Sequence, residues 1–209
     1  DGLTVEPKPF QIGVRAEHPQ PWLDRKQYGD GAGHPNLGAA DYKLTARVDG
    51  TPVFSFCMCP GGWIVPTVNE PGHLCVNGMS ESDRGSPFAC SGLVVTVEPQ
   101  DLGANSWREC LDIVRGVEAR AFLAGGSDYT APAQRIIDFA RGDRSTSLPA
   151  SSYALGLAPT ELDGVLPGFV AHKLRRSLGT FDKRIRGYLH NDALVVAPEA
   201  RASSPLRVP

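Results

Sequence analysis

The sequence predicts an α+β fold in which an antiparallel β-sheet from the first half of the chain is packed by helices from the second half, with a returning C-terminal strand. Three observations support this prediction. Apolar residues alternate with a period of two over 11–98, apolar spacings of three and four follow over 106–190, and a short β-branched run lies within 192–202. The 209 residues, 41% of them hydrophobic, can bury a core and fit a single domain.

The β-rich part, 11–98, is divided into strands by Gly and Pro residues. Ile12, Val14 and Ala16 alternate first, and Asp49-Gly50 is a typical hairpin turn between two further strands. We expect the strands to follow one another as an antiparallel meander. The predicted strands cover residues 12–16, 44–48, 53–59, 63–68, 73–77 and 92–97.

The helical part, 106–190, begins with a capping box, because Ser106 and Glu109 can satisfy free N–H groups at a helix start. This first helix is expected to end at Gly125-Gly126, which offers the left-handed residue that closes a helix. Thr130 is expected to cap a second helix that ends at Gly142, and 143–158 is expected to be a loop. The remaining predicted elements are a third helix over 167–185 and a strand at 194–196.

Composition and charge exclude several classes of protein. The net charge of −2 argues against a protein that coats polyanions, so nucleic acid binding is not expected. No apolar run approaches the roughly 20 residues that cross a bilayer. The chain starts at Asp1 without a secretory signal, and we interpret Asp1 as an internal cut or a processed end. Five cysteines form an odd, sparse set, which favours a reducing cytoplasm.

Cys57 and Cys59 would share one strand face, so they fit buried core thiols, thiols that face a ligand, or a redox pair. No second cysteine pair follows at zinc-finger spacing, and the histidines show no metal-binding spacing, so no metal is predicted. The glycines of 29–33 do not lead from a strand into a helix. This chain alone is therefore not expected to hold a dinucleotide. Gly78-Met79-Ser80 lacks the second glycine of a nucleophile elbow, which argues against a serine hydrolase.

Two further patterns leave alternatives open. Glu17 and His18 are an adjacent acid and imidazole, which could orient a substrate proton or make an ordinary hydrogen bond at a strand end. The third helical region is basic, which fits a solvated helix face or an anion-binding surface. The alternative function is therefore a non-catalytic ligand-binding or protein-interaction module with a basic helical face, formed by Lys173, Arg175, Arg176, Lys183, Arg184 and Arg186.

Several strings, in order along the chain, resemble one family. They are 13–20 (GVRAEHPQ), 37–44 (LGAADYKL), 55–62 (SFCMCPGG), 77–80 (NGMS), 131–135 (APAQR) and 199–205 (EARASSP). Together they resemble the middle part of the bacterial uncharacterised FAD-dependent dehydrogenases, which are flavoprotein oxidoreductases. The family more often has Thr or a similar residue at Ala202, which puts a hydroxyl contact there in doubt.

The resemblance implies that residues 1–209 are one inserted substrate or cap domain, whose two flanking FAD-binding Rossmann halves are absent from this chain. FAD would then be bound by the full-length protein and not by this chain alone, which would be inactive in isolation. The implied partners are the FAD-binding domain in cis and a small-molecule substrate. An insertion also requires Asp1 and Pro209 to emerge side by side.

The resemblance further implies a cleft that faces the substrate or flavin, in which arginines could neutralise a carboxylate or reduced flavin. No residue is identified as the catalytic base. The candidates are Arg15, His18, Tyr42, Cys57, Cys59, Gly61, Gly62, Asn77, Ser80, Arg135, Arg201 and Ser204.

Overall fold

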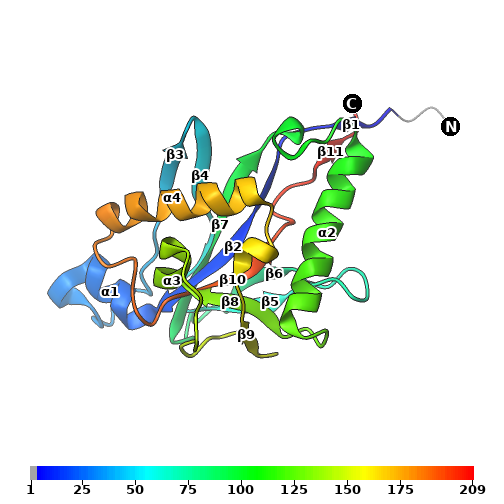
Figure 1. The fold of residues 1–209 in the computed structure, drawn as a ribbon. Helices are drawn as coiled ribbons and strands as arrows, with labels where there is room; N and C mark the ends of the chain where they lie inside the picture. The colour runs from blue at the N-terminus through cyan, green and yellow to red at the C-terminus, as the bar shows by residue number, and fades with distance from the viewer. Residues whose placement is uncertain (1–3) are drawn as a thin grey trace.

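A twisted sheet of seven strands, in the order β3-β4-β7-β2-β10-β8-β9, forms the centre of the molecule (Figure 1). The computed structural model describes residues 4–209. Neighbouring strands of this sheet pair antiparallel, except that β8 and β9 pair in parallel. The strands are β2 (Phe10–Pro19), β3 (Thr45–Val48), β4 (Thr51–Cys59), β7 (Phe88–Val97), β8 (Ala131–Arg135), β9 (Leu157–Pro159) and β10 (Leu194–Glu199).

Two small sheets accompany the large one. The hairpin of β5 (Gly62–Pro66) and β6 (Val76–Ser80) is antiparallel, and so is the pair of β1 (Glu6–Pro7) with β11 (Leu206–Arg207). The four α-helices within residues 4–209 are α1 (Gln20–Tyr28), α2 (Trp107–Gly125), α3 (Ile136–Arg141) and α4 (Gly168–Arg184). The α+β class predicted from the sequence is therefore confirmed.

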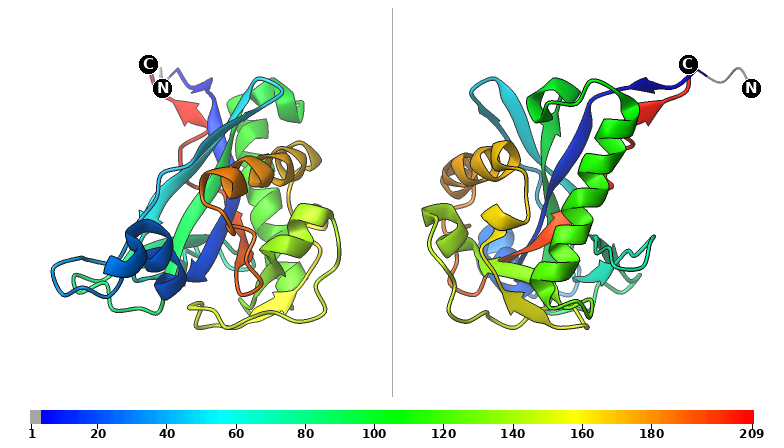
Figure 2. Two further views of the ribbon diagram at one scale, coloured as in Figure 1. Left: turned by 90° about the vertical axis from the view of Figure 1, so that its left-hand side faces the viewer. Right: turned by 45° about the vertical axis from the view of Figure 1, so that its right-hand side comes forward.

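The helices begin and end where local chemistry favours it. Ser106 and Glu109 form the predicted capping box of α2, and Gly126 closes that helix in the left-handed conformation. Helix α4 starts directly after Pro167 and buries an apolar stripe that includes Val170 and Phe181. Helix α4 packs across β3, β4, β7 and β2, whereas α2 packs on β8 and β10. The hairpin β5–β6 lies on the opposite face of the sheet from α4 (Figures 1 and 2).

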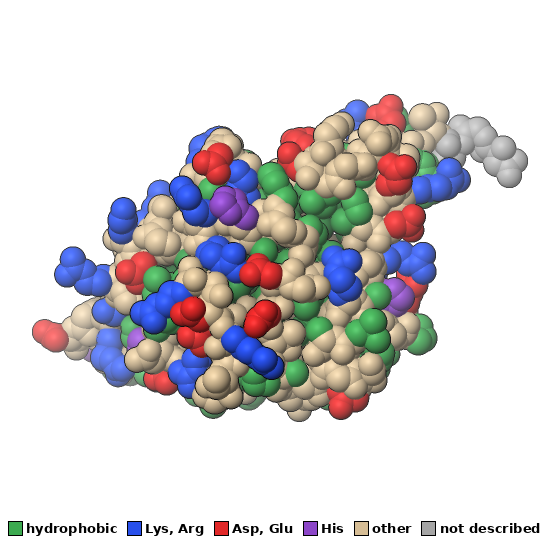
Figure 3. Space-filling view, in the orientation of Figure 1, with side chains coloured by type: hydrophobic (Ala, Val, Ile, Leu, Met, Phe, Trp, Pro, Cys, Tyr) green, Lys and Arg blue, Asp and Glu red, His purple; other side chains and the backbone are tan. Residues whose placement is uncertain are grey.

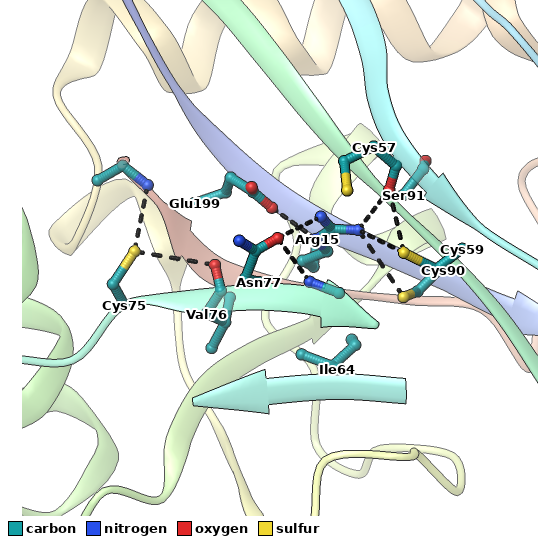
Figure 4. A network of polar contacts seen from close by, with 12 residues as sticks. Arg15, Cys57, Cys59, Ile64, Cys75, Val76, Asn77, Cys90, Ser91 and Glu199 are labelled. Atoms are coloured by element: carbon teal, nitrogen blue, oxygen red, sulfur yellow. Dashed lines mark hydrogen bonds and ion pairs between the residues drawn. The ribbon is translucent and has the colours of Figure 1, made fainter. Parts of the chain in front are cut away.

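Alternation along β2 assigns its side chains to the two faces of the sheet. Val14 opposes Leu93 of β7, and both face the layer of α4. Arg15 opposes Gly92 and points to the other face, toward β5–β6 (Figure 4). A polar layer therefore lies between the large sheet and the hairpin.

The predicted meander is wrong in its order. Strand β2 lies between β7 and β10, so the first strand of the large sheet pairs with strands far along the chain. The second predicted helix is wrong over its first turn, because Ala131–Arg135 is strand β8 and only 136–141 is helical. Pro132 favours the extended conformation at Ala131, and pairing with β10 and β9 continues the strand to Arg135. The return strand is confirmed and extends to Glu199.

Other elements were not predicted. Helix α1 follows β2 directly, β9 begins at the end of the expected loop 143–158 and continues to Pro159, and β6 begins at Val76 rather than at residue 73. Proline at the first positions of α1 suits a helix start, and this signal was available in the sequence.

Strands β1 and β11 bring two distant parts of the chain together at one end of the molecule (Figure 2). Arg207 makes an ion pair with Glu6 at 2.8 Å, and the amide of Lys8 donates to the carbonyl of Pro205. Asp1 lies outside the described residues. None of the helices in the described range is long and apolar enough to span a bilayer.

Candidate functional site

The guanidinium of Arg15 is the centre of a buried polar network between β2 and the hairpin (Figure 4). Its Nε donates to Glu199 Oε2 at 2.5 Å, and its Nη2 donates to Asn77 Oδ1 at 2.8 Å. Its Nη1 donates to the carbonyl of Cys57 at 2.8 Å. The same Nη1 lies 3.8 Å from Cys59 Sγ and 3.9 Å from Cys90 Sγ. The Arg15 side chain therefore connects β2 with four other strands, β4, β6, β7 and β10.

Strand β4 presents its cysteines through a bulge. The register with β7 shifts between Phe56 and Cys59, and Cys57 within this shift has a φ of 45°. Left-handed backbone at a cysteine is uncommon and costs on the order of 1–3 kcal/mol unless the surroundings enforce it. Here the Cys57 carbonyl accepts from both Arg15 and Cys59, which helps to hold the bulge. The result is that Cys57 is exposed, whereas Cys59 is buried.

The glycines near this network permit close packing. A Cβ on Gly78 would lie 2.3 Å from Arg15 Nη1 and 2.9 Å from Cys59 Sγ. A Cβ on Gly62 would lie 2.8 Å from the Cys59 Cβ, and Gly61 has a φ of 50° with its amide bound to the Gln20 side chain. Ser80 Oγ donates to the Pro60 carbonyl at 2.9 Å and fastens the end of the hairpin to the turn after Cys59.

Charges in this layer are mutually dependent. Burial raises the pKa of the Glu199 carboxyl, and the Arg15 charge opposes that rise. The pKa of Arg15 is raised, because Glu199 and the nearby sulfur atoms outweigh the effect of burial. A hydrogen bond from Cys90, together with Arg15, lowers the pKa of Cys59 to about 6 against the effect of burial. The pKa of the Cys90 thiol is raised by that same contact and by burial.

His18 and Tyr42 lie on the other face of the sheet and do not reach this network. Tyr42 Oη bonds Ser91 Oγ at 2.7 Å, and His18 Nε2 bonds the Tyr188 carbonyl at 2.8 Å. Burial lowers the pKa of His18 to about 4, so the imidazole is neutral near pH 7. Its Nδ1 is buried and has no partner among the described residues.

Glu17 and His18 do not form an acid–imidazole pair, because neighbouring residues of β2 point to opposite faces. The Glu17 carboxylate is bound by the backbone amide and the hydroxyl of Ser152. Burial raises the pKa of Glu17. The observed contacts fit the interpretation that Glu17 and His18 make ordinary structural hydrogen bonds.

The remaining candidates make their contacts outside the Arg15 network. Arg135 donates to the carbonyls of Ser147 and Asn191. Arg201 binds Glu118 through two hydrogen bonds of 2.5 and 2.7 Å, and Ser204 Oγ donates to the Leu206 carbonyl. Arg201 and Ser204 line an open cavity of about 480 Å³ together with Arg115. This cavity is separate from the Arg15 network.

The basic region of α4 is partly neutralised by its own neighbours. Lys173 is buried and contacts Asp49 at 3.0 Å, and Arg175 is paired with Asp163. Acidic and basic side chains are interspersed over the visible face of the molecule (Figure 3). These pairs do not favour the alternative of an anion-binding helix face.

The described residues do not fit the phosphates of FAD. Residues 29–31 form a short 3₁₀ turn after α1 rather than a turn from a strand into a helix. The donor groups of Arg15 are already engaged by Glu199, Asn77 and Cys57. Within residues 4–209, no three His, Cys, Asp or Glu side chains are placed to hold a metal ion. We therefore derive no catalytic step through a cofactor held by this chain.

Sequence reasoning did not single out Glu199, Cys90 or Gly78, although all three contact or border Arg15. Glu199 and Gly78 lie within the strings 199–205 and 77–80, so those strings contained a usable signal. Cys90 lies in none of the strings, and only its pairing with Cys59 across β4 and β7 reveals its place.

Comparisons with known proteins agree with these strings. The sequence profile of a family described as FAD-dependent protein, C-terminal domain-like, matches residues 9–202. A curated protein of Clostridium beijerinckii, described as an uncharacterized protein, is 41% identical over 212 residues. The alignment covers 100% of this chain and 40% of that relative, so the chain spans about two fifths of the relative's length.

Proposed function

The chain belongs to the family of FAD-dependent proteins with this C-terminal-like domain, and we propose that it is the substrate-facing cap of a flavoprotein dehydrogenase. The observation that carries the proposal is the convergence on Arg15. Glu199, Asn77 and the Cys57–Cys59 bulge come from three strings of the resemblance, and Arg15 of a fourth string binds all of them. Such long-range convergence supports a shared role for these strings.

Arg15 acts in this proposal as a positioning residue. It is fully buried, so it does not itself meet a substrate in this conformation. Its hydrogen bonds fix Asn77 and the backbone of Cys57, which are both exposed. A rigid support beneath exposed polar groups limits the reorganisation needed when a ligand binds. In the proposal, Asn77 and Cys57 orient the substrate, and FAD bound by the rest of the protein would supply the redox chemistry.

The exposed side of the hairpin supports a docking surface for the FAD-binding domain. Trp63 and Met79 are cross-strand partners and are 39% and 57% exposed. Val65 and Asn77 are the next pair on the same side of the hairpin. Two large apolar side chains beside Asn77 suit a surface that another domain covers. We propose that the FAD-binding domain in cis is the partner that covers it.

The paired strands β1 and β11 support an inserted arrangement, because a chain that enters and leaves side by side can interrupt another domain with little disturbance. The five cysteines are free thiols, which supports a reducing, cytoplasmic setting. The substrate in this proposal is a small molecule, and nucleic acid has no part in it.

The proposal is tested by purifying the complete protein that contains this chain. We expect a yellow protein with a flavin absorbance spectrum and with FAD released on denaturation. A well-folded but colourless complete protein would overturn the proposal.

Surface variants test the docking side. Trp63→Glu with Met79→Glu should change the visible circular dichroism of the bound flavin and expose the domain junction to protease. Leu123→Glu is the matched control, because Leu123 is an apolar side chain that is 67% exposed on α2, far along the chain from the hairpin. Equal spectra and equal proteolysis in both variants would refute docking through the hairpin.

A further inference from the structure

Two of the five cysteines lie opposite each other on neighbouring strands of the large sheet, beneath the hairpin β5–β6. Cys59 of β4 and Cys90 of β7 are direct antiparallel partners. Directly opposed residues of antiparallel strands have Cα atoms about 4.5 to 5.5 Å apart, and disulfides bridge Cα separations of roughly 4.4 to 6.8 Å. The two sulfur atoms also lie 3.8 and 3.9 Å from the same nitrogen, Nη1 of Arg15. The backbone is therefore already placed for a bond between them.

From this geometry we propose that Cys59 and Cys90 are a reversible dithiol–disulfide pair, in which Cys59 is the reacting thiolate and Cys90 the resolving thiol. The chemical class of substrate is a hydroperoxide, and the reaction is written for hydrogen peroxide, the simplest member of the class. The inference does not depend on the proposed flavin chemistry, because the oxidant reacts with side chains of this chain alone.

The reaction balances without any group outside the pair and the peroxide. The Cys59 thiolate attacks one peroxide oxygen, the O–O bond breaks, and sulfenic acid forms while hydroxide leaves and takes up a proton as water. The Cys90 sulfur then attacks the sulfenic sulfur. An S–S bond forms, the S–O bond breaks, and the oxygen leaves with the Cys90 proton as a second water. Two thiols are oxidised and one peroxide is reduced to two waters.

The surroundings assign the two roles. Arg15 on β2 places a permanent positive charge beside both sulfur atoms. These contacts favour a thiolate at Cys59, since thiolates form next to arginine. Glu199 on β10 faces the same guanidinium and partly offsets its charge. Cys90 is 0% exposed and has its thiol directed to the Trp63 carbonyl, so it suits the second, intramolecular step.

The other thiols lack one or more of these features. Cys75 is equally buried, but burial raises its pKa, and its Sγ donates to the Val76 carbonyl and accepts from the Ala200 amide. Cys110 lies on α2, where burial also raises its pKa. Cys75 is therefore the matched control, a buried thiol that accepts no hydrogen bond from an arginine.

The test uses hydrogen peroxide on the purified 209-residue chain, followed by blocking of free thiols, trypsin digestion and mass spectrometry. Cleavage at Arg84 separates residues 48–84, which carry Cys57, Cys59 and Cys75, from residues 85–108, which carry Cys90. We expect these two peptides to become cross-linked and to separate again with dithiothreitol. Near pH 7, a thiol of pKa about 6 has about 30 times the thiolate fraction of an ordinary thiol, so Cys59 should react before Cys75.

Variants locate the bond. Cys59→Ser and Cys90→Ser should each abolish the cross-link, whereas Cys57→Ser and Cys75→Ser should retain it. Fragmentation of the cross-linked wild-type peptides gives the same answer if a variant fails to fold. A cross-link that survives Cys59→Ser, or oxidation of the wild type that stops at sulfinic acid without any cross-link, would overturn the proposal.

Discussion

The substitution Gly78→Ala tests the close packing around Arg15. The new methyl carbon would lie 2.3 Å from Arg15 Nη1, 2.7 Å from its Cζ and 2.9 Å from Cys59 Sγ, all shorter than any ordinary carbon contact. The guanidinium cannot retreat freely, because it is fully buried and bound to Glu199, Asn77 and Cys57. Overpacking costs typically 1–3 kcal/mol, and loss of one charged hydrogen bond adds about 1.5–3 kcal/mol. We expect a total loss of about 2.5–6 kcal/mol in the free energy of unfolding.

For a chain of this length that loss lowers Tm by about 5–24 °C. The assay is urea denaturation of the wild type and the variant followed by circular dichroism, with thermal melts in parallel. Gly179→Ala is the matched control, because Gly179 lies inside α4 and a Cβ there would meet nothing within 4 Å. Alanine should stabilise that helix by about 0.5–1 kcal/mol. If Gly78→Ala unfolds at the same urea concentration as the wild type, the packing inferred for Arg15 is wrong.

Four other variants probe three separate features. Glu199→Gln leaves the buried Arg15 charge without its carboxylate and should cost about 3–5 kcal/mol in urea denaturation, whereas the paired change Arg15→Met with Glu199→Leu should recover much of that loss. The folded-state pKa of His18 is lowered to about 4, so the unfolded chain binds a proton that the folded chain does not, and stability should fall as the pH drops from about 6.5 to 4. Between pH 6.5 and 4, the free energy of unfolding of His18→Phe should fall by about 3 kcal/mol less than that of the wild type, as measured by denaturation at several pH values. An equal fall in both proteins would contradict the lowered pKa of His18. Ser106→Ala removes the cap of α2 and should lower the free energy of unfolding by about 1 kcal/mol in the same assay, while an unchanged value would show that the cap contributes nothing.

Local patterns predicted much of the fold. Alternation identified β2, the Asp49-Gly50 turn identified the β3–β4 hairpin, and the capping box located the first residue of α2. Strand order could not be predicted in the same way, because neither turn signals nor periodicity specify a partner far along the chain. The placement of β10 beside β2 depends on packing of the whole core. Apolar spacing favoured a helix over 131–135, whereas Pro132 favours extended backbone at the residue before it.

The candidate site, too, could be predicted only in part from the sequence. Periodicity placed Cys57 and Cys59 on one strand face, but the bulge turns the first outward and leaves the second buried. A bulge adds a residue to one strand only, and that depends on the partner strand. The pairing of Arg15 with Glu199 across 184 positions likewise needs the three-dimensional neighbours, although both residues stood in strings that the family resemblance had marked. The roles of these residues toward a substrate stay predictions.

The position of β10 has a consequence for how the protein is made. This strand lies in the interior of the large sheet, between β2 and β8, yet it comes from residues 194–199. Until this segment leaves the ribosome, β2 and β8 lack their partner strand. Such unpaired strand edges are prone to pair with other chains. The sheet can therefore be completed only after residues 194–199 have been translated. Chaperone binding during synthesis should persist until that late stage.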